Sequence, residues 1–149
     1  MLTSKREQNQ RNKHIVSCLR KFGFNDIKTD KLGWVLYPNE LLDVEEIEFI
    51  SKNEKVSQNS IEVGRGLNNV WTYGISYCTG GAGGSGSASI FGETCKTRNE
   101  AIIKALQKLI EAHQYQEQRC KGDSLGNYID SYSQQIRKEV LNILYEITN

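Results

Sequence analysis

Bulky and small side chains alternate without interruption from residue 71 to residue 78. The bulky set is Trp71, Tyr73, Ile75 and Tyr77, and the small set is Thr72, Gly74, Ser76 and Cys78. Because successive side chains of a β-strand point to opposite faces, the pattern predicts a strand with one bulky and one small face. Such a strand fits a half-buried sheet, with the bulky face against a helix and the small face toward solvent or a partner.

Neighbouring segments predict further strands. Residues 60–67 precede Asn68 and Asn69, which tolerate the left-handed conformations that tight hairpin turns need. The glycine-rich stretch CTGGAGGSGSASIFG follows at residues 78–92. We expect it to form a hairpin tip that leads into a third strand at residues 88–96, with Cys95 opposite Trp71. Glycines at such a tip expose backbone N–H and C=O groups.

Helical periodicity marks both ends of the chain. In residues 11–24 the apolar stripe is Ile15, Cys18, Leu19 and Phe22, and Gly23 fits a left-handed cap. Thr97 and Glu100 form a capping box that starts a second helix, whose stripe is Ile102, Ala105, Leu106, Leu109 and His113. A last helix is predicted from the near-heptad stripe Leu125, Ile129, Tyr132, Ile136, Val140, Ile143 and Ile147. It packs on its neighbour or on the same helix of a second subunit, so a homodimer is one alternative.

Two segments are read less directly. Residues 26–38 flank a polar centre at Asp30 and Lys31, which suggests a hairpin closed by Pro38. Residues 43–52 are compatible with a strand, but Asp43 and Glu46 resemble a capping box, and we expect a short helix. The chain is therefore predicted to be one α+β domain over residues 1–149, with a basic helix in 1–22, mainly antiparallel strands in 24–96 and two helices in 97–149.

Charge is unevenly distributed along the sequence. The net charge is +1, but residues 1–28 contain seven basic and two acidic side chains, whereas residues 39–48 contain five acidic side chains and no basic one. Either the two segments are solvated faces that attract each other, or the first is a basic N-terminal arm for phosphates. The basic residues of the arm that are candidates for nucleic-acid contact are Lys5, Arg6, Arg11, Lys13, Arg20 and Lys21.

Catalytic and metal chemistry find little support in the sequence. No cysteine pair has C-x-x-C spacing, and His14 and His113 lie far apart in the chain. The glycine-rich stretch lacks the lysine and the following helix of a phosphate-binding loop. We therefore expect no metal, no cofactor and no enzymatic activity. The polar N-terminus and the lack of a long apolar run predict a cytoplasmic protein with reduced cysteines and no membrane contact.

Binding is the remaining class of function. Arg65 stands between two glycines, near the aromatic residues of the alternating strand. The aromatic side chains are either a stacking surface or part of the core, and the glycine-rich stretch is either a contact surface or a tether. The candidate binding residues are Arg65, Trp71, Tyr73, Tyr77, Gly80, Gly81, Gly83, Gly84 and Arg98.

Two resemblances extend this interpretation. ETCKTRNEAIIKALQKLI, with the strands before it, resembles the end of a double-stranded RNA-binding domain, although a lysine cluster at the helix start is missing. Residues 71–105 resemble a small module of phage and plasmid accessory proteins, in which a W-x-Y-G strand, a glycine-rich tip and a T-R-x-E-A-I helix start follow one another. The second resemblance implies a mobile genetic element, where small non-enzymatic proteins often act by binding, including inhibitors of host defence such as anti-CRISPR proteins.

The leading hypothesis is a non-enzymatic binding protein of a phage or other mobile element that inhibits a host defence complex through protein–protein contact. One alternative is a nucleic-acid-binding module that uses the basic N-terminal helix. Another is a protein that sequesters a nucleotide-like ligand between aromatic and arginine side chains.

Overall fold

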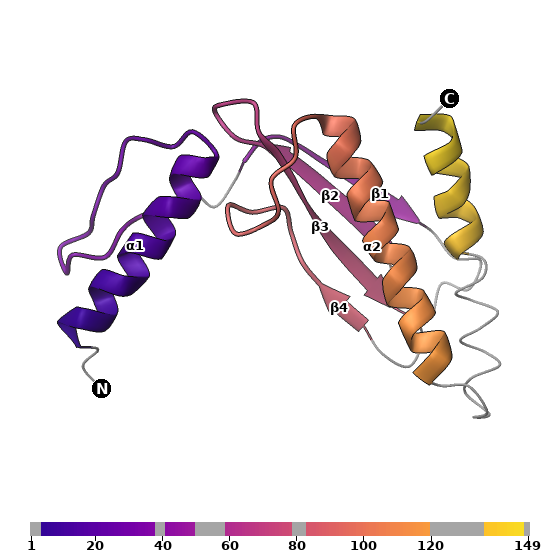
Figure 1. Cartoon of the computed structure of the whole chain (residues 1–149), viewed down its shortest axis with the longest axis horizontal. Helices are drawn as coiled ribbons and strands as arrows, with labels where there is room; N and C mark the ends of the chain where they lie inside the picture. The colour runs from indigo at the N-terminus through magenta and orange to yellow at the C-terminus, as the bar shows by residue number, and fades with distance from the viewer. Residues whose placement is uncertain (1–3, 38–40, 50–58, 79–82, 120–135, 148–149) are drawn as a thin grey trace.

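One antiparallel sheet organises the molecule. The computed structural model describes residues 4–37, 41–49, 59–78, 83–119 and 136–147. The elements are α1 (Lys5–Lys21), β1 (Leu42–Phe49), β2 (Asn59–Arg65), β3 (Trp71–Cys78), β4 (Gly83–Ser85), α2 (Arg98–Arg119) and a helix at residues 136–147 (Figure 1). The strands lie in the order β1-β2-β3-β4, and every neighbouring pair is antiparallel. The predicted α+β fold is confirmed.

The main core lies between the sheet and α2. Ile61 and Val63 of β2 are buried against Leu106 and Leu109 of α2, and the bulky side chains of β3 pack around them. The helix at 136–147 covers the same face of the sheet, because Ile136 joins this cluster (Figure 1). The strand predicted from the alternation at residues 71–78 is therefore confirmed, and its bulky side chains lie on the helix-covered face.

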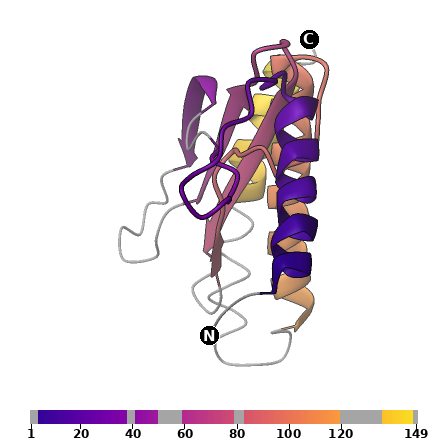
Figure 2. The ribbon, with the colours of Figure 1, turned by 90° about the vertical axis from the view of Figure 1, so that its left-hand side faces the viewer.

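Helix α1 belongs to a second apolar cluster. Its predicted stripe is buried and packs on Val35, Leu41, Ala88 and Ile90. The helix begins earlier than the apolar stripe, because Ser4 Oγ accepts a hydrogen bond from Glu7 N at 3.2 Å and caps the first turn. Gly23 follows it with φ of +82°, as predicted for a left-handed cap. Viewed from the α1 side, α1 and α2 lie on the same side of the strands (Figure 2).

The expectation of a short helix in residues 43–52 is wrong over the described part of that segment. Residues 42–49 form β1, and its residues Ile47 and Phe49 lie opposite Ile61 and Asn59 of β2. Asp43 has φ of +50°, which is incompatible with the extended conformation of a helix N-cap. Pairing with β2 thus overrides the local capping signal.

The third strand is displaced from its expected place at residues 88–96. β4 is made by the glycine-rich stretch itself, where Gly83 and Ser85 lie opposite Cys78 and Ser76. Cys95 lies opposite Trp71 as predicted, but only in an isolated bridge. Ten residues lead from Ser85 to Cys95, whereas five separate their partners Ser76 and Trp71. The excess chain must therefore leave the edge of the sheet between the two contacts.

Some expectations are met in reduced form, and some lie outside the described residues. The hairpin at residues 26–38 contains a single bridge, between Thr29 and Val35. Glu100 N donates to Thr97 Oγ1 at 3.1 Å as predicted, but the Glu100 carboxylate accepts from Lys96 N instead of Thr97 N. Pro38 and residues 123–135 of the last helix fall outside the described ranges.

None of the described helices combines the length and apolarity needed to cross a membrane.

Candidate functional site

The sheet face opposite α2 is polar. Strand register places two rows of side chains across this face, because directly opposite residues of antiparallel strands point the same way. One row contains Glu48, Ser60, Ser76 and Ser85, one residue from each strand in sheet order. The next row contains Glu46, Glu62 and Gly74.

These rows enclose a small hollow of about 140 Å³. Two carboxylates, of Glu46 and Glu62, and four hydroxyls, of Ser60, Ser76, Ser85 and Ser87, line it. Ser60 is only 7% exposed as a residue, and its hydroxyl has no hydrogen bond to another described residue. Because Ser60 lines the hollow, its hydroxyl is available to accept a hydrogen bond from a ligand.

The segment at residues 86–92 forms one wall of the hollow. It crosses β3 where the strand carries its small residues: a Cβ atom on Gly74 would lie 2.4 Å from the Ser87 carbonyl carbon. Ala88 N donates a 3.0 Å hydrogen bond to Glu62 Oε1, which fixes the segment over the sheet. The small face of β3 is thus covered in part by the chain itself, and the cover positions Ser87 beside Ser85.

The two carboxylates of the hollow are in direct opposition. Glu46 and Glu62 are register partners on neighbouring strands. No lysine, arginine or histidine nitrogen lies within 4.0 Å of either carboxylate in the described part of the chain. Directly opposite like charges destabilise a sheet, by an amount on the order of 0.5 kcal/mol. A cation placed between the two glutamates would relieve this repulsion.

The predicted aromatic surface is largely covered. Trp71, Tyr73 and Tyr77 are half-buried and pack on the main core beneath α2. Tyr73, Tyr77 and Gly84 nevertheless meet in an open hollow of about 500 Å³, which Lys108 and Glu93 also line. The structure therefore brings three of the predicted binding residues together, but at the edge of β3 and not on an open aromatic face.

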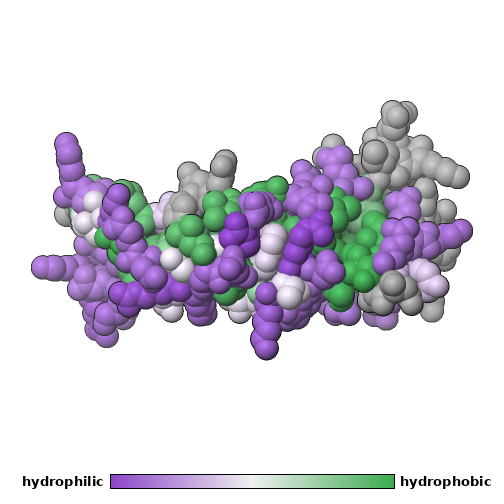
Figure 3. Space-filling view, turned by 90° about the horizontal axis from the view of Figure 1, so that it is seen from above, coloured by the Kyte–Doolittle hydropathy of each residue, from purple (hydrophilic) through white to green (hydrophobic). Residues whose placement is uncertain are grey.

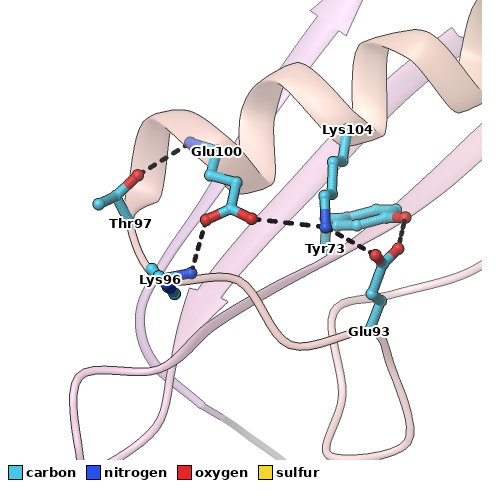
Figure 4. A network of polar contacts seen from close by, with 6 residues as sticks. All are labelled: Tyr73, Glu93, Lys96, Thr97, Glu100 and Lys104. Carbon is cyan, nitrogen blue, oxygen red and sulfur yellow. Dashed lines mark hydrogen bonds and ion pairs between the residues drawn. The ribbon is translucent and has the colours of Figure 1, made fainter.

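A polar network fixes this edge to α2 (Figure 4). Tyr73 Oη donates to Glu93 Oε2 at 2.6 Å, and Lys104 Nζ donates to Glu93 Oε1 at 2.7 Å. Burial and the hydrogen bond to Glu93 raise the pKa of the Tyr73 phenol. The hydrogen bond from Lys104 lowers the pKa of Glu93, and the same bond raises the pKa of Lys104. All these groups hold their ordinary charge states at neutral pH, which suits a structural contact.

The predicted arginines are engaged in ion pairs. Arg65 Nε lies 2.7 Å from Asp43 Oδ2, and Arg98 Nε donates to Glu45 Oε2 at 2.9 Å. Two members of the acidic segment 39–48 are thus neutralised by β2 and α2, not by the basic N-terminal segment. Neither guanidinium reaches the hollow lined by Tyr73 and Tyr77. Gly83 and Gly84 form β4, whereas Gly80 and Gly81 lie outside the described residues.

The basic N-terminal residues remain on the surface. All six candidates on α1 are exposed, and none forms an ion pair within the described ranges; the six are Lys5, Arg6, Arg11, Lys13, Arg20 and Lys21. Hydrophilic side chains project from the α1 end, at the left of Figure 3. A hollow of about 740 Å³ runs along α1, with Lys13 and Arg20 among its lining residues. Arg11 is set apart, because its guanidinium lies 5.8 Å from the centre of the Trp34 ring.

Neither metal ligands nor an activated nucleophile emerges within the described residues. No group of three His, Cys, Asp or Glu side chains there is arranged to hold a metal ion. Burial raises the pKa of the Cys95 thiol, which opposes thiolate formation. Cys18 Sγ lies 3.8 Å from His14 Nε2, but Cys18 is buried within the second apolar cluster.

Apart from the small face of β3, the polar face was not predicted from the sequence. Its serines and Glu62 carry a readable signal, since Ser60 and Glu62 alternate with Ile61 and Val63. The assignment of Glu46 to a helix hid its place opposite Glu62, and a three-residue glycine strand gave no periodicity to follow.

Comparison with known proteins adds no identification. The sequence matches no protein-family model, and neither the curated proteins nor the solved structures contain a significant match.

Proposed function

We propose that this chain is a non-catalytic binding protein that contacts a partner protein through the polar sheet face opposite α2. The observation that carries the proposal is the opposition of Glu46 and Glu62, with no cation within 4.0 Å of either among the described residues. This arrangement costs stability in the free protein, and a cationic partner surface would offset that cost. Functional sites commonly cost stability, and this opposition of charges fits such a site.

The setting we propose is a phage or other mobile element, with a host defence complex as the partner. This part of the proposal depends on the resemblance of residues 71–105 to accessory-protein modules. The geometry supports the contact itself, since a polar face with unrelieved negative charge is suited to steering a basic surface into register.

Charge reversal in the hollow tests the proposal. Glu46→Lys replaces the repulsion with Glu62 by attraction, so the fold should be retained while binding to a basic partner is lost. The measurement is mass spectrometry of a native pull-down from host lysate, with and without nuclease. The matched control is Glu146→Lys, which makes the same charge change at an exposed position of the helix at 136–147.

A nuclease-resistant protein retained by the wild type and by Glu146→Lys, and lost with Glu46→Lys, supports the proposal. If the same protein binds all three chains with equal strength, the polar face is not the contact surface and the proposal fails.

Nucleic-acid binding is the second candidate function, and it is favoured by the exposed cations of α1. Lys13 and Arg20 are seven residues apart, so both lie on one face of the helix, roughly 10 Å apart along its axis. Neither forms an ion pair among the described residues. Such a face is able to contact phosphates without reading sequence.

Salt dependence tests this second function. Lys13→Ala should weaken binding to a mixed-sequence duplex RNA and reduce the slope of log K against log salt by about 1, since one phosphate contact is lost. Lys138→Ala, which removes an exposed cation from the helix at 136–147, should leave the slope unchanged. Binding that does not vary with salt, or that responds equally to both variants, excludes α1 as a phosphate-binding face.

A further inference from the structure

We infer that the hollow lined by Glu46, Glu62 and the four serines receives the guanidinium of an arginine side chain of the partner protein. This inference rests on the proposed function, because it names the group by which the partner is recognised. Three features of the hollow lead to it: its chemistry, its size and its open acceptors.

The chemistry of the hollow calls for a donor-rich cation. Its side-chain oxygens comprise two carboxylates and four hydroxyls, and no side-chain nitrogen lines it among the described residues. Glu62 Oε1 already accepts from Ala88 N, which leaves Oε2 and both oxygens of Glu46 for a ligand. The hydroxyl of Ser60, a residue that is only 7% exposed, also lines the hollow and has no hydrogen bond to another described residue, so it adds a further acceptor. An anion is excluded by the two glutamates.

The size of the hollow limits the ligand to a single side-chain head group. Its volume is about 140 Å³. Pockets for cofactors and drug-sized molecules occupy roughly 300–1,000 Å³, so a nucleotide is too large for it. A water molecule takes up about 30 Å³, and the hollow therefore holds the equivalent of a few waters. This is adequate for a guanidinium and the end of its aliphatic stem.

The arrangement of the acceptors favours arginine over lysine. Glu46 and Glu62 project from neighbouring strands about 4.8 Å apart, and the serine row lies two residues further along, roughly 6.7 Å away. A planar guanidinium has five N–H groups in a fixed fork and is able to reach both carboxylates and a hydroxyl together. A lysine ammonium is a compact point charge with three donors, and it cannot span the two rows.

The test uses three tripeptide probes and amide-detected NMR titration of the full chain. The probes are acetyl-Gly-Arg-Gly-amide, its neutral isostere with citrulline in place of arginine, and the lysine analogue. We expect the arginine probe to shift the amide resonances of Ser60, Ser76 and Ser85. The lysine probe should bind with lower affinity, and the citrulline probe should not bind. Glu46→Gln should lower the affinity for the arginine probe about tenfold, because a charge-assisted hydrogen bond is lost.

Glu146→Gln serves as the matched control, since it removes the same charge from an exposed helical position and should leave the affinity unchanged. Glu46→Gln should fold with a melting temperature equal to or above that of the wild type, because it also removes the repulsion. A weakened probe therefore reports the site and not unfolding.

Failure of this inference and failure of the proposed function give different results. Equal binding of the arginine and citrulline probes, equal binding of arginine and lysine, or no effect of Glu46→Gln overturns guanidinium recognition. If the partner protein is still lost on Glu46→Lys in the pull-down while the arginine probe does not bind, the polar face remains the contact surface and only the arginine assignment is wrong.

Discussion

Acidification from pH 6.5 to about pH 4 should remove about 3 kcal/mol from the free energy of unfolding, through His113 alone. His113 is fully buried, and burial, reinforced by the charge of Arg137, lowers its pKa from 6.5 to about 4. Between these values the unfolded chain binds a proton that the folded chain excludes. The stabilisation is therefore complete above pH 6.5 and is lost as the pH falls.

The contacts of His113 explain why it stays neutral. Its Nε2 lies 2.6 Å from Asn59 Oδ1, which also accepts from Cys78 N at 3.2 Å. Because an amide oxygen only accepts, Nε2 carries the proton and donates. Asn59 Nδ2 donates in turn to Cys78 O at 3.2 Å, so one buried amide joins α2 to the end of the β2–β3 hairpin.

The measurement is urea unfolding at several pH values between about 7 and about 5, where the other groups with lowered pKa values contribute little and His113 should already account for about 2 kcal/mol of the loss. His113→Gln is the control variant, since glutamine donates to Asn59 but does not titrate. Its unfolding free energy should be lower than that of the wild type yet nearly independent of pH in this window. Parallel pH profiles for the two chains would show that His113 is not the responsible group.

His113 also shows what sequence periodicity reveals. Its place in the stripe with Leu106 and Leu109 follows from helical spacing, and the structure buries all three. Its partner Asn59 is 54 residues away. Nothing in the local sequence relates the two positions, because the contact depends on the packing of α2 across β2 and β3.

The same difference between local sequence patterns and long-range contacts explains which segments were assigned correctly and which were not. Residues 71–78 were predictable because their alternation is strong and complete. Residues 42–49 carry a local capping signal, and only the pairing of Ile47 and Phe49 with β2 makes them a strand. β4 consists of Gly83, Gly84 and Ser85, which have little intrinsic preference for a strand, and its pairing with β3 decides its conformation.

The candidate site was hidden for a related reason. Its residues come from four strands and from the segment at 86–92, so no linear motif contains them. The small face of β3 was visible in the sequence, as a surface for solvent or a partner. That residues 86–92 return across Gly74 could not be inferred without the register that separates β4 from Cys95.

Substituting Gly74 with alanine should lower the free energy of unfolding by about 3 kcal/mol, at the upper end of the cost of overpacking. The new Cβ would lie 2.4 Å from the Ser87 carbonyl carbon and 2.7 Å from Gly86 O. Both are backbone atoms, so relief requires the segment at 86–92 to move away from the sheet. That movement would break the hydrogen bond from Ala88 N to Glu62 and open the wall of the hollow.

Gly86→Ala is the matched control, because the added Cβ would lie 3.4 Å from its nearest neighbour, Ile75 O. Both substitutions reduce the entropy of the unfolded chain equally, so the difference between them isolates the contact with residues 86–87. Urea unfolding should place Gly86→Ala within about 0.5 kcal/mol of the wild type. The Gly74→Ala chain should also fail to bind the arginine probe under conditions in which it remains folded, since Ser87 would no longer line the hollow. Wild-type stability and probe binding in Gly74→Ala would contradict the close approach of residues 86–92 to β3, on which the shape of the site depends.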